Sequence, residues 1–269
     1  MSNEFTLNIP ERLMKYKPLL QRSIVPYVSI STIKQITTVW QSKFGGKPYW
    51  PIKYNYPLDS TNKPMQLLAQ INFSELPAIS DLPQTGILQI FISTVTDYYG
   101  INFDNLIMQE DFKIIYHPEL LEDKQKLYTD FSFIESINYE RFPITEECVL
   151  NFEYKYAPVP LCDFQFEKYF GQHVNTFLDD KKYEEEGWSL YENLYPGAGH
   201  KIGGYARFAQ TDPREDTIYH DYNILLLQID TDEESGISWG DGGVANFFIR
   251  HQDLIKLDFT NIIYNWDCY

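Results

Sequence analysis

Lys43-Phe44-Gly45-Gly46 recurs 158 residues later as Lys201-Ile202-Gly203-Gly204. The same offset carries Gln70-Ile71 onto Gln228-Ile229 without a gap. Over the 29 positions from the first lysine to the end of the second motif, seven residues are identical, whereas about two would match by chance. A period this long is typical of domain-scale duplication and not of a solenoid. The sequence therefore predicts two pseudo-symmetric halves, with copies at about 41–93 and 199–250.

Most of the remaining pattern is β. Segments rich in β-branched and aromatic residues, bounded by Gly, Pro, Asn or Asp, predict strands at 33–40, 66–72, 86–93, 112–116, 147–156, 223–230, 244–250 and 261–266. Helices are predicted at 10–21, 163–170, 180–193 and 251–257. Hairpin-scale loops separate many strands, and strands and helices do not alternate regularly. The predicted fold is α+β: mainly antiparallel β, internally duplicated, with a few peripheral helices and residues 1–269 forming one two-lobed domain.

Composition and charge exclude several classes of partner. The 269 residues are 43% hydrophobic and carry a formal net charge of -16 at pH 7. Such a field repels phosphate backbones and anionic bilayers, so neither nucleic acid nor membrane is an expected partner. The first 22 residues contain charges among their apolar positions, so we expect no signal peptide and a cytoplasmic location. Three cysteines, Cys148, Cys162 and Cys268, form no CxxC pattern and predict no disulfide framework.

Five motifs resemble one known family: Ser42-Lys43-Phe44-Gly45-Gly46, Leu67 to Ile71, Leu82-Pro83 with Gly86 to Phe91, His200 to Gly204, and Trp239 to Gly243. Together they resemble the YwqG family, a bacterial domain of unknown function also catalogued as DUF1963. The resemblance extends from about Gln41 to Trp266. It implies an intracellular bacterial protein with a β-rich duplicated fold, and an immunity or interaction role through an association with toxin systems. It supplies no activity.

The polar residues of the repeated motifs are the candidate ligand-binding set. Adjacent glycines let backbone N–H groups approach a ligand closely, and nearby cations can pair with an anion. The candidates are Lys43, Gly45, Gly46, Gln70, Lys201, Gly203, Gly204, Gln210, Asp212, Arg214, Gln228, Trp239 and Asp241. The competing interpretation is structural, because Gly-Gly also forms tight turns and bulges. We favour the structural interpretation.

Acid–base chemistry would be confined to the second half. Ser42 and Asn72 of the first copy correspond to His200 and Asp230 of the second. His200 is the candidate catalytic residue because histidine titrates near neutral pH, with Asp212, Asp230 or Asp241 as its partner. No hydrolase motif accompanies it, so a structural histidine is the preferred interpretation.

One acidic stretch approaches the spacing of a calcium loop. Its candidate ligands are Asp230, Asp232, Glu234 and Asp241. Position six of the loop is Ser235 instead of glycine, and position twelve is aspartate instead of glutamate. A solvated hairpin loop is therefore preferred, and we expect neither a metal nor a cofactor.

Three functions remain open at this stage. The first is a non-catalytic interaction or immunity-type protein whose acidic surface covers a basic protein partner. The second is a small-ligand-binding module with a cleft between the halves, where Lys43, Lys201 and Arg214 would converge. The third is an enzyme that uses His200 with a nearby aspartate. The absence of catalytic motifs ranks the interaction protein first.

Overall fold

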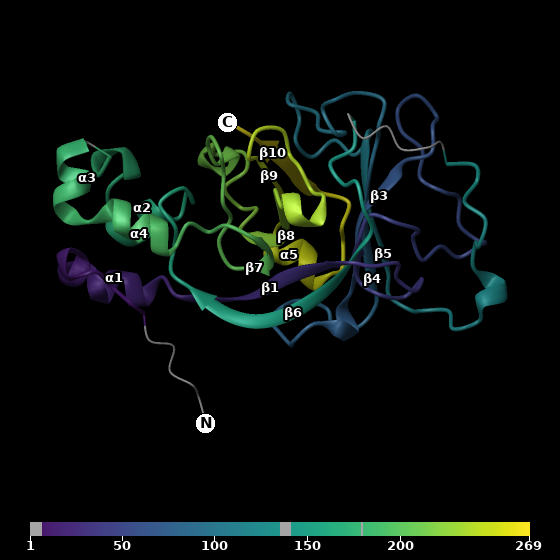
Figure 1. The fold of residues 1–269 in the computed structure, drawn as a ribbon, viewed down its shortest axis with the longest axis horizontal. Helices are drawn as coiled ribbons and strands as arrows, with labels where there is room; N and C mark the ends of the chain where they lie inside the picture. Colours follow the sequence, from purple (N-terminus) through teal and green to yellow (C-terminus); the bar gives the residue numbers. More distant parts are fainter. Residues whose placement is uncertain (1–6, 135–140, 179) are drawn as a thin grey trace.

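The computed structural model describes residues 7–134, 141–178 and 180–269. One antiparallel sheet of ten strands, in the order β10-β9-β8-β7-β1-β6-β2-β3-β4-β5, organises the chain (Figure 1). The strands are β1 Val25–Lys34, β2 Lys43–Phe44, β3 Gln66–Asn72, β4 Ile87–Ile92, β5 Phe112–His117, β6 Cys148–Ala157, β7 His200–Gly203, β8 Ile224–Asp230, β9 Val244–Ile249 and β10 Ile262–Asp267. The predicted class, mainly antiparallel β with a few helices, is confirmed.

The longest strands, β1 and β6, form the middle of the sheet. They pair over ten residues, from Val25 opposite Ala157 to Lys34 opposite Cys148. On its other edge β1 pairs with β7, and β6 pairs with β2. In sequence, β1 belongs to the first half but pairs with β7 of the second half. Likewise, β6 comes later in the chain but pairs with β2 of the first half. The strand order is symmetric about the β1–β6 pair, while the duplication itself stays a prediction.

A single hydrophobic core joins the two sides of the sheet. Its buried residues include Phe44 and Ile90 from one side and Leu226 and Phe247 from the other. A register shift occurs at Leu67/Ala69 in β3 and again at Leu225/Leu227 in β8, which are positions related by the offset of 158. Because both sides share this core, apolar side chains occupy the space between them.

The outer strands β5 and β10 approach each other through a loop instead of a ladder. Tyr264 N–H donates to the Leu106 carbonyl at 3.0 Å. Gln109 connects the two edges: its Oε1 accepts from Ile114 N–H at 2.9 Å, and its Nε2 donates to the carbonyls of Phe259 and Thr260, each at 3.0 Å. One amide side chain therefore replaces part of a missing strand pairing, and the sheet curls into a near-barrel.

The helices lie mainly at one end of the molecule, beyond the β1–β6 pair (Figure 1). The helical elements are η1 Glu11–Tyr16, α1 Lys17–Arg22, η2 Phe73–Glu75, η3 Lys124–Lys126, α2 Phe166–Phe170, η4 Val174–Thr176, α3 Asp180–Glu186, α4 Trp188–Leu194, η5 Pro213–Glu215, η6 Glu233–Ser235 and α5 His251–Ile255. A second apolar cluster around Phe166, Trp188 and Tyr191 packs α1, α2 and α4 together. Within the described ranges, no helix has the length and apolar character needed to span a bilayer.

Most predicted elements are found within a few residues of their expected bounds. The predicted helix at 180–193 is divided at Gly187, whose φ is 77°. The predicted strand at 33–40 is wrong, because the strand is Val25–Lys34 and the chain then leaves the sheet. Pro26 is tolerated there because it lies opposite Tyr156 near the end of the ladder, where a missing N–H costs little. Beyond the strand, Glu147 accepts from Thr37 N–H at 3.0 Å and so holds the departing chain in a turn.

Replacing Gln109 tests the closure of the sheet. Gln109→Ala should lower the free energy of unfolding by about 1–3 kcal/mol. The reason is that the backbone N–H of Ile114 and the carbonyls of Phe259 and Thr260 lose their hydrogen-bond partner. Urea unfolding followed by circular dichroism measures this change. Gln125→Ala is the matched control, since Gln125 is exposed on η3, and it should unfold like the wild type. Equal stability of the two variants would contradict the closing role of Gln109.

Candidate functional site

The two repeated lysines are buried and bonded to backbone. Lys43 Nζ donates to the carbonyls of Thr38 at 2.8 Å and Lys47 at 3.0 Å. Lys201 Nζ donates to the carbonyls of Gly197 and Tyr205. Burial lowers the pKa of both lysines, from 10.5 to about 8. Each ammonium group therefore holds the turn around its own strand and is not presented to a ligand.

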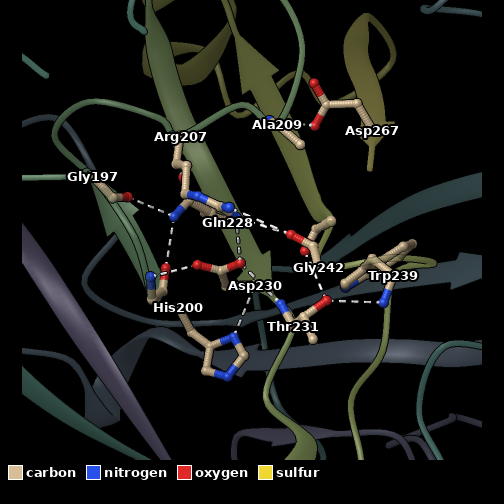
Figure 2. A network of polar contacts seen from close by, with 12 residues as sticks. Gly197, His200, Arg207, Ala209, Gln228, Asp230, Thr231, Trp239, Gly242 and Asp267 are labelled. Atoms are coloured by element: carbon tan, nitrogen blue, oxygen red, sulfur yellow. Dashed lines mark hydrogen bonds and ion pairs between the residues drawn. The ribbon is translucent and has the colours of Figure 1, made fainter. Parts of the chain in front are cut away.

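The two repeated glutamines hold the same turns from the neighbouring strands (Figure 2 shows the second). In each, the amide oxygen accepts a backbone N–H and the amide nitrogen donates to two carbonyls. The partners of Gln70 are Tyr49 N–H at 2.7 Å and the carbonyls of Val39 at 2.9 Å and Gln41 at 2.8 Å. The partners of Gln228 are Arg207 N–H at 2.8 Å and the carbonyls of Gly197 at 3.0 Å and Gly199 at 2.7 Å. All three contacts recur at the offset of 158, so the repeated polar residues support the backbone.

The Gly-Gly pairs are required by turn geometry. All four glycines have positive φ, between 67° and 74°. A Cβ at Gly46 would lie 2.3 Å from the carboxyl carbon of Glu147, and one at Gly204 would lie 2.9 Å from the Cβ of Tyr27. Close packing against protein atoms accounts for these glycines without a ligand.

Of the aspartates proposed as its catalytic partners, His200 bonds to Asp230, and it does so through the backbone. Its Nδ1 accepts the backbone N–H of Asp230 at 3.0 Å (Figure 2), and Ser42 Oγ does the same for Asn72 in the first half. Its Nε2 lies 3.6 Å from Asp232 Oδ2. Burial is the largest influence on its pKa, which is lowered. The imidazole is therefore a neutral acceptor that closes the β7–β8 connection.

The carboxylates of the calcium-like stretch are directed to separate partners. Asp230 forms an ion pair with Arg207 at 3.0 Å (Figure 2), and Asp232 accepts from Thr32 Oγ1 at 3.0 Å. Among the described residues, no group of three or more His, Cys, Asp or Glu side chains could hold a metal ion. The ring of Trp239 is fully buried, and its N–H has no hydrogen-bond partner among the described residues. Asp241 lies in the exposed turn that follows.

Arg214 forms a buried ion triad with two aspartates. Its side chain is almost fully buried, and Nε and Nη2 donate to the two oxygens of Asp212 at 2.9 and 2.7 Å. Nη2 also donates to Asp163 Oδ2 at 2.9 Å. Burial raises the pKa of Asp163. The guanidinium carbon lies 3.9 Å from the ring centre of Phe248 and 4.5 Å from that of Phe164.

The corresponding place in the first half is aromatic. The offset of 158 relates Arg214 to Tyr56 and Asp212 to Tyr54. Tyr56 packs on Phe91, with ring centres 5.7 Å apart, as Arg214 packs on Phe248. A buried ion pair is often no more stabilising than apolar residues of similar volume. The predicted duplication therefore places an uncharged residue in the first half where the second half has Arg214.

A cavity of about 710 Å³ lies beside the triad. Its lining residues come from segments 161–168, 173–178, 210–215 and 220–223 and from Glu192. Its acidic lining residues are Asp163, Glu167, Glu192, Asp212 and Glu215, against one lysine, Lys168. Of the residues predicted from sequence, Gln210 and Asp212 line this cavity and Arg214 lies behind it. The residues contributed by α2 and α4 were missed, because nothing in their spacing connects them to the repeats.

A more open hollow of about 670 Å³ lies at the seam near Gln109. Lys113 and Asp258 are its charged lining residues, so their charges offset each other. The cavity beside the triad is therefore the better candidate functional site.

Residues 42–268 match the family described as "Domain of unknown function (DUF1963)". The chain belongs to the DUF1963 family. This match confirms the DUF1963 part of the predicted resemblance and includes both Gly-Gly turns, the triad and the cavity. No curated protein gives a significant match to this DUF1963 chain.

The buried ammonium of Lys201 predicts a pH dependence. Its pKa is about 8 in the folded state, against 10.5 in an exposed lysine. Between these values the unfolded chain binds more protons, so the free energy of unfolding should rise with pH, by up to about 3 kcal/mol. Lys201→Met should lessen this rise and leave the part that Lys43 contributes, because the pKa of Lys43 is also about 8. Chemical unfolding from pH 8 to pH 10.5 measures how steeply the free energy of unfolding rises with pH. The exposed control Lys256→Met should keep the wild-type slope. An unchanged slope in Lys201→Met would count against the prediction.

Truncating the triad should be costly. Arg214→Met leaves two buried carboxylates without their cation and should lower the free energy of unfolding by about 3–5 kcal/mol. Lys34→Met, which removes a surface ion pair with Glu146, should cost at most about 1 kcal/mol. Urea unfolding of both variants provides the comparison. Similar losses would show that the triad is not electrostatically isolated from solvent.

Proposed function

We propose that this DUF1963 chain is a non-catalytic binding protein that receives a cationic side chain of a basic protein partner in the cavity beside Arg214. The observation that carries the proposal is the charged triad beside that cavity, at a position where the first half has aromatic residues. In some proteins buried charges are retained for specificity, and strongly perturbed ionisable groups beside a cleft are candidates for function. Two members of the triad, Asp163 and Asp212, line the cavity, so the cavity is the place where a partner would reach them.

The charge of the cavity supports a cationic occupant. Glu167, Glu192 and Glu215 line it from exposed positions, and Lys168 is the one lysine among its lining residues. Behind them, the triad joins two carboxylates to one guanidinium. At longer range, the net charge of -16 would steer a basic partner toward the molecule.

A small cationic ligand is the second candidate. The cavity volume of about 710 Å³ lies within the range of about 300–1,000 Å³ that is common for small-molecule sites. This candidate replaces the predicted cleft between the halves, since Lys43 and Lys201 bond to backbone carbonyls. An enzyme that uses His200 has less support, because Nδ1 already accepts a backbone N–H.

The proposal also keeps what the sequence resemblance implies. These predictions are a YwqG-like protein, a bacterial and cytoplasmic setting, and an immunity-type role. A basic toxin domain would then be the partner that enters the cavity.

Neutralising the cavity tests this function. In Glu167→Gln/Glu192→Gln/Glu215→Gln, a fluorescein-labelled peptide of alternating glycine and cationic residues should bind about tenfold or more weakly than to the wild type, since about 1.4 kcal/mol of lost attraction has that effect. Fluorescence anisotropy at low salt measures the affinity. The matched control is Glu110→Gln/Glu119→Gln/Glu122→Gln, which changes the net charge equally at exposed positions that do not line the cavity. If both triple variants bound the peptide equally weakly, net charge alone would explain the binding, and the cavity proposal would be wrong.

A further inference from the structure

Four planar groups form a continuous stack from the core to the cavity. Phe248 on β9 lies deepest, and the guanidinium carbon of Arg214 is 3.9 Å from its ring centre. The ring of Phe164 lies on Arg214 at 4.5 Å, and the exposed imidazole of His220 stacks on Phe164 with ring centres 5.5 Å apart and planes 29° apart. Phe164 and His220 both line the cavity.

The triad fixes the orientation of this stack. Asp212 accepts the backbone N–H of Phe164 at 3.0 Å and also binds Arg214 through both carboxylate oxygens. Phe164 is therefore held from below by a guanidinium and from its own backbone by a carboxylate. His220 is added from the segment before β8, so the stack ends in an aromatic surface at the cavity wall.

The surroundings of Arg214 show which groups this molecule uses to hold a guanidinium. The guanidinium of Arg214 lies over the rings of Phe248 and Phe164 and forms ion pairs with two carboxylates. The lining of the cavity contains the same kinds of component. His220 supplies an aromatic face, and Glu215, one residue after Arg214, supplies a carboxylate that lies 3.8 Å from His173. Glu167 lines the same cavity from α2.

We propose that the cavity selects a guanidinium group, the side chain of an arginine in the partner, over a primary ammonium. This inference rests on the proposed function and names the cation that the site prefers. A guanidinium is planar, so it can stack on His220 while its N–H groups bind carboxylates at the edge. An ammonium has no flat face and is more strongly hydrated, so it gains less from the aromatic surface.

Peptides that differ in one functional group provide the test. Three labelled peptides of the same length carry arginine, lysine or citrulline between glycines. By fluorescence anisotropy, the wild type should bind the arginine peptide about fivefold or more tightly than the lysine peptide, which corresponds to about 1 kcal/mol of stacking. The citrulline peptide is planar but uncharged and should bind most weakly.

Two variants at the end of the stack separate stacking from charge. His220→Leu should bind both cationic peptides with similar affinity, whereas His220→Phe keeps an aromatic face and should retain the preference for arginine. Unchanged circular dichroism and unfolding midpoints check that both variants are folded.

The outcomes distinguish the two proposals. Equal binding of arginine and lysine peptides to the wild type would overturn guanidinium selection and leave the cationic site in place. Binding of neither peptide would overturn the proposed function together with the selection. A preference for arginine that persists in His220→Leu would show that His220 does not provide the selective face and would overturn the stacking argument.

Discussion

The ten-residue ladder between β1 and β6 is the interaction on which the rest of the structure depends. On their other edges, β1 pairs with β7 and β6 pairs with β2, so each pairs with a short strand from the other part of the sequence. Neither side can therefore complete its sheet without a strand from the other. The shared core that includes Phe44 and Phe247 follows from this exchange, as does the lack of an open division between the halves.

The two sides of the sheet hold their turns with similar side-chain hydrogen bonds but differ in the residues that fill the space beyond these turns. Lys43 with Gln70, and Lys201 with Gln228, hold their turns through corresponding contacts. The difference lies farther along the chain, where Tyr56 of one side corresponds to Arg214 of the other. Support for function therefore comes from the position at which the two sides differ, because residues that recur at corresponding places serve the fold that both sides share.

The sequence indicated the sheet better than the site. Segment 66–72 matches β3 at both ends, whereas the duplication predicted from the repeated lysines and glutamines stays a prediction. The same residues were candidate ligands, yet their polar atoms bind carbonyls that become neighbours only when the turns form. Arg214 was also a candidate, but its partner Asp163 is 51 residues away and carries no periodic signal. The cavity depends on such distant pairs, so its prediction required the fold.

The order of the strands also has a consequence for synthesis. During synthesis β1 leaves the ribosome before both of its neighbours, β6 and β7, which are translated more than a hundred residues later. Until then its edges have no partner, and such unpaired edges favour aggregation in unfinished chains. Pairings so distant in sequence are also slow to form. The nascent chain should therefore need protection of Val25–Lys34 until the second half has been made.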